Sequence, residues 1–253
     1  MEGATAVPVS VLILTLNEAD NIGTLLCHLR EVLAERWPAA EFVVVDADSP
    51  DRTAALAREA GARVMIEKER GYGIALRRGL AAARGERVVT LDADHSHEPG
   101  SVPELLDAAE DAEIVIGSRY IRAGRAEMPP LRRLLSVALN IAFRKIFDLP
   151  VKDASSGFRV YRRSIFGEMR LSGRDFEILQ EILIGAWRRG ARIAEVPIHY
   201  RPRSAGASKA RVLLLGWRYL GALFRLARRS EGSDGAARGG ASRADSTRPS
   251  GSA

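Results

Sequence analysis

The chain has 253 residues, of which 46% are hydrophobic and 28% charged, as is typical of a soluble globular protein with a sizeable core. The net charge of +6 suits anionic partners such as nucleotides, lipid phosphates, anionic membranes or nucleic acid, and does not choose among them. Aromatic residues make up only 6% of the chain and no nucleic-acid recognition motif occurs, so we expect no nucleic-acid partner.

Strands and helices alternate through the first half of the chain. Apolar runs predict strands at 9–16, 42–45, 63–66, 87–91 and 114–116. Helical spacing of apolar residues predicts helices at 18–36, 49–60, 74–84 and 102–109. Ser49 is the expected N-cap of the second helix, with Pro50 at its first position. Alternation at this spacing predicts an α/β fold with a mostly parallel sheet flanked by helices.

The pattern becomes less regular after residue 118. We expect a loop at 122–130, a helix at 131–147, an extended segment at 155–161, a helix at 176–189, a short strand at 192–196, and a basic loop at 197–207. Residues 212–227 read as a Leu-rich helix, and the Gly, Ser, Ala and Arg residues after 230 have little to bury. The expected organisation is one domain over 1–210, an amphipathic helix over 211–229, and a disordered basic tail over 230–253.

Cysteine content and hydropathy bear on the compartment. Cys27 is the only cysteine, so no intramolecular disulfide can form, and its helical context predicts a small core residue. Neither a signal peptide nor an uninterrupted apolar run of ~18 residues is evident. The 211–229 helix, with Trp217 and Arg218, is either a membrane-interfacial helix or one packed on the domain. We expect a cytoplasmic protein at the cytoplasmic face of the membrane.

Polar residues follow three of the predicted strands. They are Leu16-Asn17-Glu18, Asp46-Ala47-Asp48 and Asp92-Ala93-Asp94. Because ligands bind beyond the carboxyl ends of parallel strands, these segments are expected on one rim. Carboxylates at i and i+2 can direct hard oxygen ligands toward one divalent cation, Mg²⁺ or Mn²⁺, although short polar turns are also common after strands.

Two other patterns are weaker. Gly71-Tyr72-Gly73 does not fit the spacing of a dinucleotide-binding turn, so these glycines more simply allow close backbone approach at a helix start. His95 and His97 lie near Asp94, but a further ligand at zinc-site spacing is missing.

The motifs in order resemble the GT-A glycosyltransferases of family 2. These motifs are 15–18 (TLNE), 45–53 (VDxxSxDxT), 71–73 (GxG), 92–97 (DADxSH) and 117–120 (GSRY). Five later segments resemble the dolichol/polyprenol-phosphate mannose synthase group within that family. They are 132–140 (RRLLSxxxN), 153–161 (DxxSGFRxY), 176–183 (FEILxEIL), 195–198 (EVPI) and 203–209 (RxxGxSK).

The resemblance implies inverting, metal-dependent transfer of mannose from GDP-mannose to a polyprenyl phosphate. It places the metal on Asp92, Asp94 and Ser96. It implies donor contacts from Leu16, Asn17, Glu18, Asp46, Asp48, Gly73, Asp92, Ala93, Asp94 and Arg119. It implies acceptor or phosphate contacts from Arg119, Arg133, Ser136, Arg203 and Lys209. Catalytic roles are expected for Asp94, Arg133 and Glu181, the last facing the active site.

Two departures leave alternatives open. Ala47 stands where the family usually has a second acidic residue, and Met128-Pro129-Pro130 replaces a more usual Trp-containing turn. The donor could therefore be UDP-glucose or another nucleotide sugar. A non-lipid acceptor bearing only hydroxyls would need a general base, for which Glu181 is the candidate. The alternative outside enzymology is a non-catalytic nucleotide-sugar binding protein.

Overall fold

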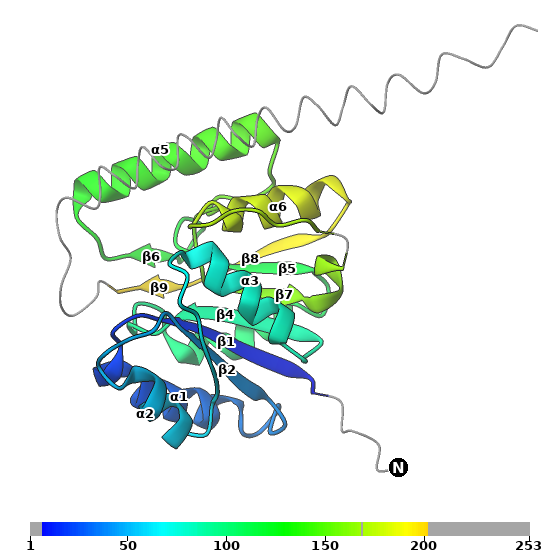
Figure 1. Cartoon of the computed structure of the whole chain (residues 1–253). Helices are drawn as coiled ribbons and strands as arrows, with labels where there is room; N and C mark the ends of the chain where they lie inside the picture. The colour runs from blue at the N-terminus through cyan, green and yellow to red at the C-terminus, as the bar shows by residue number, and fades with distance from the viewer. Residues whose placement is uncertain (1–6, 168, 202–253) are drawn as a thin grey trace, which may run out of the picture.

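A seven-stranded sheet with the order β3-β2-β1-β4-β7-β5-β8 forms the centre of the computed structural model, which describes residues 7–167 and 169–201 (Figure 1). The strands of this sheet are β1 Val9–Thr15, β2 Glu41–Asp46, β3 Arg63–Ile66, β4 Arg87–Asp92, β5 Ile114–Ser118, β7 Arg159–Arg162 and β8 Ile193–Pro197. All neighbouring strands pair in parallel except β7, which runs antiparallel to both β4 and β5. The predicted mostly parallel α/β sheet is therefore confirmed.

Helices cover both faces of this sheet. They are α1 Ala19–Leu33, α2 Thr53–Glu59, α3 Tyr72–Ala82, α4 Val102–Ala108, α5 Pro130–Phe147 and α6 Ile178–Arg188, with short 3-10 turns at Pro99–Ser101 and Arg163–Phe166. Alternate strand residues point to opposite faces, so Val11 packs with α1 and α4 in one core while Leu12 packs with α3 and α6 in the other. The near-continuous apolar strands reflect this burial on two faces.

A second, two-stranded sheet lies beside the main one. Its strands β6 (Arg125–Ala126) and β9 (His199–Tyr200) pair in parallel. This pairing falls within segments that the sequence predicted as loops, because two-residue strands carry no measurable periodicity. It ties the chain just before α5 to the chain just after β8 (Figure 1).

Two local predictions were wrong, and a third was confirmed only in part. Helix α2 begins at Thr53 after a left-handed Arg52 (φ 67°), so Ser49 is not its N-cap and instead bonds to Asp46. Cys27 is exposed, because it faces away from the buried stripe of α1. The extended segment predicted at 155–161 is a strand only from Arg159, preceded by a turn.

Of the helices that the structure describes, α5 has the smallest share of buried residues, and it lies at the edge of the domain (Figure 1). Its buried residues are Asn140, Phe143 and Phe147, near its carboxyl end. Large apolar side chains are exposed at Leu131, Leu134, Leu135, Ile141 and Ile146. None of the described helices combines the length and hydropathy of a membrane span. Arg203, Lys209, the 211–229 helix and the 230–253 tail lie outside the described residues, so their predictions stay predictions.

Candidate active site

The loops after β1 and β2 are joined by side-chain hydrogen bonds at the carboxyl rim of the sheet. Asn17, which adopts a left-handed φ of 58°, donates its N–H to Ser49 Oγ at 2.9 Å. The N–H of Glu18 donates to Thr53 Oγ1 at 2.9 Å, which fixes the start of α1 against α2. The predicted donor segments 16–18 and 46–48 therefore meet, as expected for adjacent parallel strands.

Asp46 is the buried anchor of this rim. Its carboxylate is 0% exposed and accepts from Thr15 Oγ1 at 2.7 Å and from both the N–H and the Oγ of Ser49, at 2.8 and 2.7 Å. Asp48, with a φ of 57°, is instead exposed, and Leu16 is 41% exposed. Asp46, the last residue of β2, therefore organises the loop, whereas Asp48 faces solvent.

The Asp92–His97 loop carries the predicted metal ligands. Burial and the neighbouring charge of Asp94 raise the pKa of Asp92 to about 7, although Arg119 acts in the opposite direction. The side chain nevertheless keeps 39% exposure, so water screens part of this repulsion. Asp94 accepts a hydrogen bond from the Ser96 N–H at 3.1 Å. Two carboxylates that repel each other fit the chemistry of a hard divalent cation.

Ser96 supplies a second observation that favours a cation here. Ser96 is 1% exposed, and its Oγ has no hydrogen-bond partner among the described residues. A buried hydroxyl without a partner is costly unless a ligand or water completes it. The same described residues contain no cluster of three or more His, Cys, Asp or Glu side chains that could hold a metal alone. The set therefore fits an Mg²⁺ or Mn²⁺ ion that takes its remaining ligands from a diphosphate and water.

His97, at the end of this loop, is buried against aromatic side chains. It is 3% exposed, and its ring lies 5.1 Å from the Phe158 ring and 5.8 Å from the Tyr200 ring. Burial lowers the pKa of His97 to about 4, so the imidazole is neutral near pH 7. A neutral ring packed between aromatic side chains is a wall of the site, and zinc is not needed to explain it.

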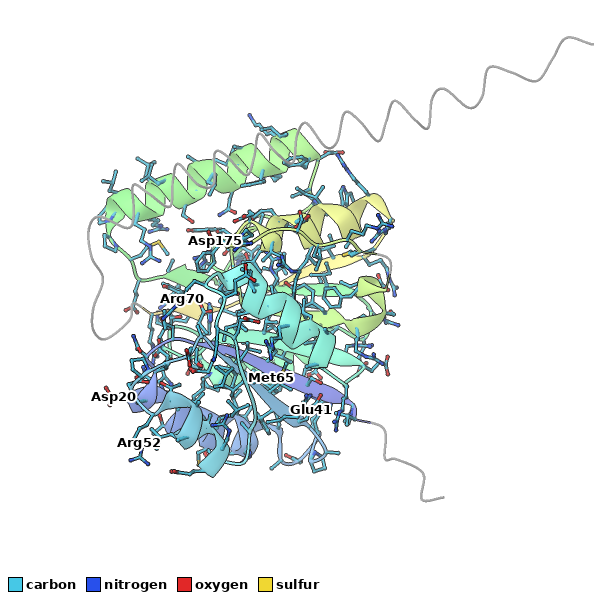
Figure 2. All side chains as sticks on the ribbon, viewed as in Figure 1. Asp20, Glu41, Arg52, Met65, Arg70 and Asp175 are labelled. Carbon is cyan, nitrogen blue, oxygen red and sulfur yellow. The ribbon has the colours of Figure 1, made fainter. Side chains whose placement is uncertain are left out.

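The Gly71–Gly73 turn packs against the loop before α6. A Cβ on Gly73 would lie 2.4 Å from the Gly173 carbonyl oxygen, and one on Gly71 2.4 Å from that of Arg174. The Gly73 N–H donates to the same Arg174 oxygen at 2.8 Å. Figure 2 shows Arg70 and Asp175 on the two loops beside α3. The prediction that these glycines allow close backbone approach is confirmed.

Glu181 holds that same loop. Its carboxylate accepts from the Ser172 N–H and Oγ and, at 2.7 Å, from the Gly173 N–H. Nearby, the Tyr72 and Phe176 rings stack with their centroids 4.2 Å apart. Glu181 therefore links the start of α6 to the glycine turn of α3.

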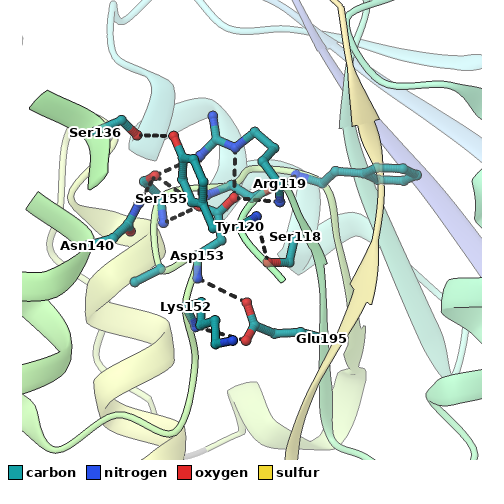
Figure 3. Close-up of polar contacts among 12 residues, drawn as sticks. Ser118, Arg119, Tyr120, Ser136, Asn140, Lys152, Asp153, Ser155 and Glu195 are labelled. Carbon is teal, nitrogen blue, oxygen red and sulfur yellow. Dashed lines mark hydrogen bonds and ion pairs between the residues drawn. The ribbon is translucent and has the colours of Figure 1, made fainter. Parts of the chain in front are cut away.

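Arg119, directly after β5, forms a fork with the buried Asp153. Its Nε and Nη2 each lie 2.7 Å from one Asp153 oxygen, and Nη2 also donates to Ser155 Oγ at 2.8 Å (Figure 3). Ser155 Oγ accepts from Asn140 of α5 at 3.1 Å. The charge of Arg119 holds the pKa of Asp153 below its ordinary value despite burial, which acts in the opposite direction.

The predicted acceptor residues on α5 differ in their surroundings. Ser136 Oγ accepts a hydrogen bond at 2.8 Å from the hydroxyl of Tyr120, the residue that follows Arg119 (Figure 3). Arg133 lies one turn earlier on α5 and is exposed. A cavity of about 210 Å³ beside this contact is lined by Tyr120, Val137, Asn140, Ile141, Arg144 and Lys152.

The Asp92–His97 loop and the Arg119 region are contiguous. The Arg201 N–H donates to the Ser96 carbonyl oxygen at 3.1 Å. Tyr200 lies between His97 and Arg119, its ring centroid 5.5 Å from the Arg119 guanidinium carbon. The structure thus brings Asp92, Asp94, Ser96 and Arg119 into one site, with Ser136 at its α5 side.

Two buried residues received no role from sequence reasoning. Asp153 pairs with Arg119, while Arg159, which is 0% exposed, donates to the carbonyls of Ala154, Ser156 and Leu179. Both stand in the 153–161 segment that carried the family resemblance. An arginine between two apolar residues, Phe158 and Val160, was the available signal.

Comparison with known proteins places this sequence among glycosyltransferases. Residues 10–170 match the family described as Glycosyl transferase family 2. The chain is 36% identical over 229 residues to a dolichol-phosphate mannosyltransferase of Pyrococcus furiosus, covering 86% of this chain and 63% of that protein. It is 34% identical to a polyprenol monophosphomannose synthase of Mycolicibacterium smegmatis, covering 79% of each, and 36% identical to a dolichyl-phosphate hexose transferase of Haloferax volcanii, covering 77% and 83%.

Solved structures share the fold. A glucosyl-3-phosphoglycerate synthase of Mycobacterium tuberculosis, crystallised with Mn²⁺, UDP-glucose and phosphoglyceric acid, superimposes with a TM-score of 0.70 at 23% identity, covering 87% of this chain and 79% of that one. A mannosyl-3-phosphoglycerate synthase of Rubrobacter xylanophilus gives a TM-score of 0.69 at 23% identity, covering 89% and 75%.

The mostly parallel sheet, its carboxylate rim and the family match together identify a glycosyltransferase with the GT-A fold. The chain belongs to glycosyl transferase family 2, and within it resembles the dolichol-phosphate mannose synthases.

Proposed function

We propose that the protein transfers a mannosyl residue, with inversion, from GDP-mannose to a polyprenyl phosphate. The main support for this proposal is the position of Arg119. Its charge acts on Asp92, while its neighbour Tyr120 bonds to Ser136 of α5. One arginine thus adjoins both the carboxylate pair for a donor diphosphate and the helix that bears Arg133. Relatives named for dolichyl and polyprenyl phosphates, at 34–36% identity, support this assignment of acceptor.

The chemistry of such an acceptor explains the choice of residues. A phosphate monoester has a second pKa of about 6 and is largely dianionic at neutral pH, so a general base is not required. Arginine is needed instead, to position one anion beside another. The engagement of Glu181 with Ser172 and Gly173 supports a role in shaping the site, rather than in removing a proton.

Asp92 and Asp94, with Ser96 or a water, are the residues that would hold Mg²⁺ or Mn²⁺. When bound, the cation stabilises charge on the leaving nucleoside diphosphate. A structural neighbour that is 25% identical was crystallised with Mn²⁺ and UDP, which supports this proposal. Arg203 and Lys209 remain proposed phosphate contacts, and Arg201, two positions before Arg203, bonds to Ser96.

A second candidate is a hexosyl transfer from UDP-glucose or another nucleotide sugar. It is favoured by Ala47 after β2, where the family usually has an acid, and by neighbours crystallised with UDP or UDP-glucose. This second candidate differs from the first only in the sugar donor, and the fold and the acceptor chemistry are the same.

A donor screen tests both candidates. Purified full-length protein is incubated with Mg²⁺ or Mn²⁺, polyprenyl phosphate and GDP-mannose, UDP-glucose or other nucleotide sugars, and sugar on lipid is measured. We expect transfer from GDP-mannose that EDTA abolishes. Asp94→Ala should abolish turnover and weaken donor binding, whereas Asp107→Ala, an exposed carboxylate paired with Arg36, should not. No transfer from any donor, or full activity of Asp94→Ala, would contradict the proposal.

We also propose that the protein acts at the cytoplasmic face of a membrane. Exposed Leu131 and Leu134 on α5, within about a turn and a half of Ser136, support access to a lipid-borne acceptor. Sedimentation with anionic liposomes measures this directly. Liposome binding should weaken in the double variant Leu131→Gln/Leu134→Gln and in a protein that lacks residues 211–253. If neither the wild type nor these variants bind liposomes, the proposed membrane location is wrong.

A further inference from the structure

We infer that Asp153 is a positioning residue that fixes the direction of the Arg119 guanidinium, and that Glu195 holds Asp153 in place for this purpose. The inference deepens the proposed function and rests on it, because it concerns how the phosphate-binding arginine is aimed. It is carried by a set of hydrogen bonds that join Arg119, at the end of β5, to the 152–156 turn, and that turn to β8 and α5.

Asp153 is saturated with donors although it is 0% exposed. From Arg119 it receives Nε and Nη2 at 2.7 Å each and the backbone N–H at 3.1 Å. The remaining donors belong to the turn itself, namely the Ser155 N–H and Oγ at 3.3 and 3.0 Å and the Ser156 N–H at 3.1 Å. A carboxylate used this fully has no oxygen left for substrate, so its effect on chemistry passes through Arg119.

The fork restricts Arg119 at both ends of its side chain. Its backbone N–H and its guanidinium bind the same carboxylate, so the side chain cannot rotate without losing a charge-assisted, bidentate pair. Within the described residues no hydrogen bond engages the third nitrogen, Nη1, which carries no dashed contact in Figure 3. The Tyr120 and Tyr200 rings lie 5.2 and 5.5 Å from the guanidinium carbon. Nη1 is the nitrogen left for a phosphate oxygen.

Glu195 forms the next layer of support. It lies on β8 in register with Ile116 of β5. Its two oxygens accept from the N–H groups of Asp153 and Lys152, at 3.0 and 2.8 Å (Figure 3). Glu195 of β8 therefore holds the turn that contains Asp153, and Asp153 in turn binds Arg119 at the end of β5. The negative charges of Asp153 and Glu195 offset the positive charge of Arg119. This arrangement would be unfavourable if the site required only positive charge.

Charge and direction predict opposite outcomes for Asp153→Asn. Removing a negative charge beside Arg119 should tighten anion binding if Asp153 only tempers the positive charge. If Asp153 aims the guanidinium, the amide cannot accept from both Nε and Nη2, and anion binding should weaken. Misplacement of a positioning group by about 1 Å can cost ~100-fold in rate. We therefore expect a kcat lowered by roughly 10- to 100-fold, with a raised KM for polyprenyl phosphate.

The experiment uses the full-length wild type, Asp153→Asn, Arg119→Lys and the double variant. Calorimetric binding of inorganic pyrophosphate with Mg²⁺ is measured first, because it needs no turnover. Asp153→Asn should weaken it by roughly tenfold or less while adding little in the Arg119→Lys background, since coupled residues give non-additive effects. Asp107→Asn, on the exposed Arg36 pair, serves as the matched control. Tighter or unchanged binding, or additive losses, would overturn the inference.

Two further measurements separate the possible failures. Glu195→Gln keeps the Asp153 charge but loses one backbone contact, so it should also weaken pyrophosphate binding. It provides the test if Asp153→Asn does not fold. Unchanged binding in a folded Glu195→Gln protein counts against the role of Glu195. A wild type that binds pyrophosphate but transfers no sugar to polyprenyl phosphate rejects the proposed function alone, because the coupling between Asp153 and Arg119 is still measured.

Discussion

Substituting Gly73 by alanine should test how closely the start of α3 packs on the loop before α6. The new Cβ would lie 2.4 Å from the Gly173 carbonyl oxygen and 2.9 Å from both the Arg174 carbonyl carbon and the Asp175 oxygen. Since ordinary contact begins near 3.4 Å, one of the two backbones must move by about 1 Å. That movement would break the 2.8 Å bond from the Gly73 N–H to the Arg174 oxygen.

The cost follows from these contacts. Overpacking typically costs ~1–3 kcal/mol and the hydrogen bond about 1 kcal/mol, against a gain of about 1 kcal/mol in helix propensity. A net loss of about 2 kcal/mol would lower Tm by roughly 4–8 °C in a protein of this size. Gly23 of α1 offers the matched control, because nothing lies within 4 Å of the position that an added methyl group would take.

Thermal unfolding followed by circular dichroism decides the matter. Gly23→Ala should raise Tm by roughly 2–4 °C, since alanine is the better helix former and meets no clash. Gly73→Ala should fall below the wild type. If Gly73→Ala melts at or above the wild-type temperature, the close approach of the two loops does not exist and the reasoning from it fails.

Two further predictions concern the buried charges. Arg159→Met should lower the free energy of unfolding by roughly 3 kcal/mol in urea titrations, because the carbonyls of Ala154, Ser156 and Leu179 lose their guanidinium donor; an unchanged midpoint would contradict this. Burial opposes ionisation of Asp153, but Arg119 holds its pKa below 3.8, so its stabilisation is present above that value and is lost as the pH falls toward the folded-state pKa. Stability measured from pH 5 to pH 3 should therefore fall less steeply in Asp153→Asn than in the wild type, and equal slopes would refute the linkage.

Much of the fold was predictable because its signals are local. Apolar runs such as 9–16 and 87–91 are long enough to identify buried strands, and alternation with helices implies parallel pairing. The carboxylate rim followed from this, since parallel strands end on the same side. The antiparallel strand β7 was less evident, because a four-residue strand with an arginine at each end does not reveal its direction.

Short polar segments were predicted less well. Ser49 has the side chain of an N-cap, but the buried Asp46 captures its hydroxyl and N–H, and the helix starts later. Cys27 sits among apolar residues in the sequence, yet it follows the buried Leu26 by one position and therefore lies on the exposed face of α1. The first prediction failed because Asp46, only three residues away, competes for the Ser49 side chain, and the second because Cys27 lies off the buried stripe of α1.

The sequence by itself determined the α/β architecture, the family and the order of polar segments along the rim, because each is encoded in local periodicity or in motifs. Only the tertiary structure decided which of those groups meet. It joined Asp153 to Arg119 across 34 positions, Glu195 to the Asp153 backbone across 42, and Arg201 to Ser96. Such pairings depend on how β5, β7 and β8 lie side by side, and residue spacing along the chain does not specify which strands become neighbours.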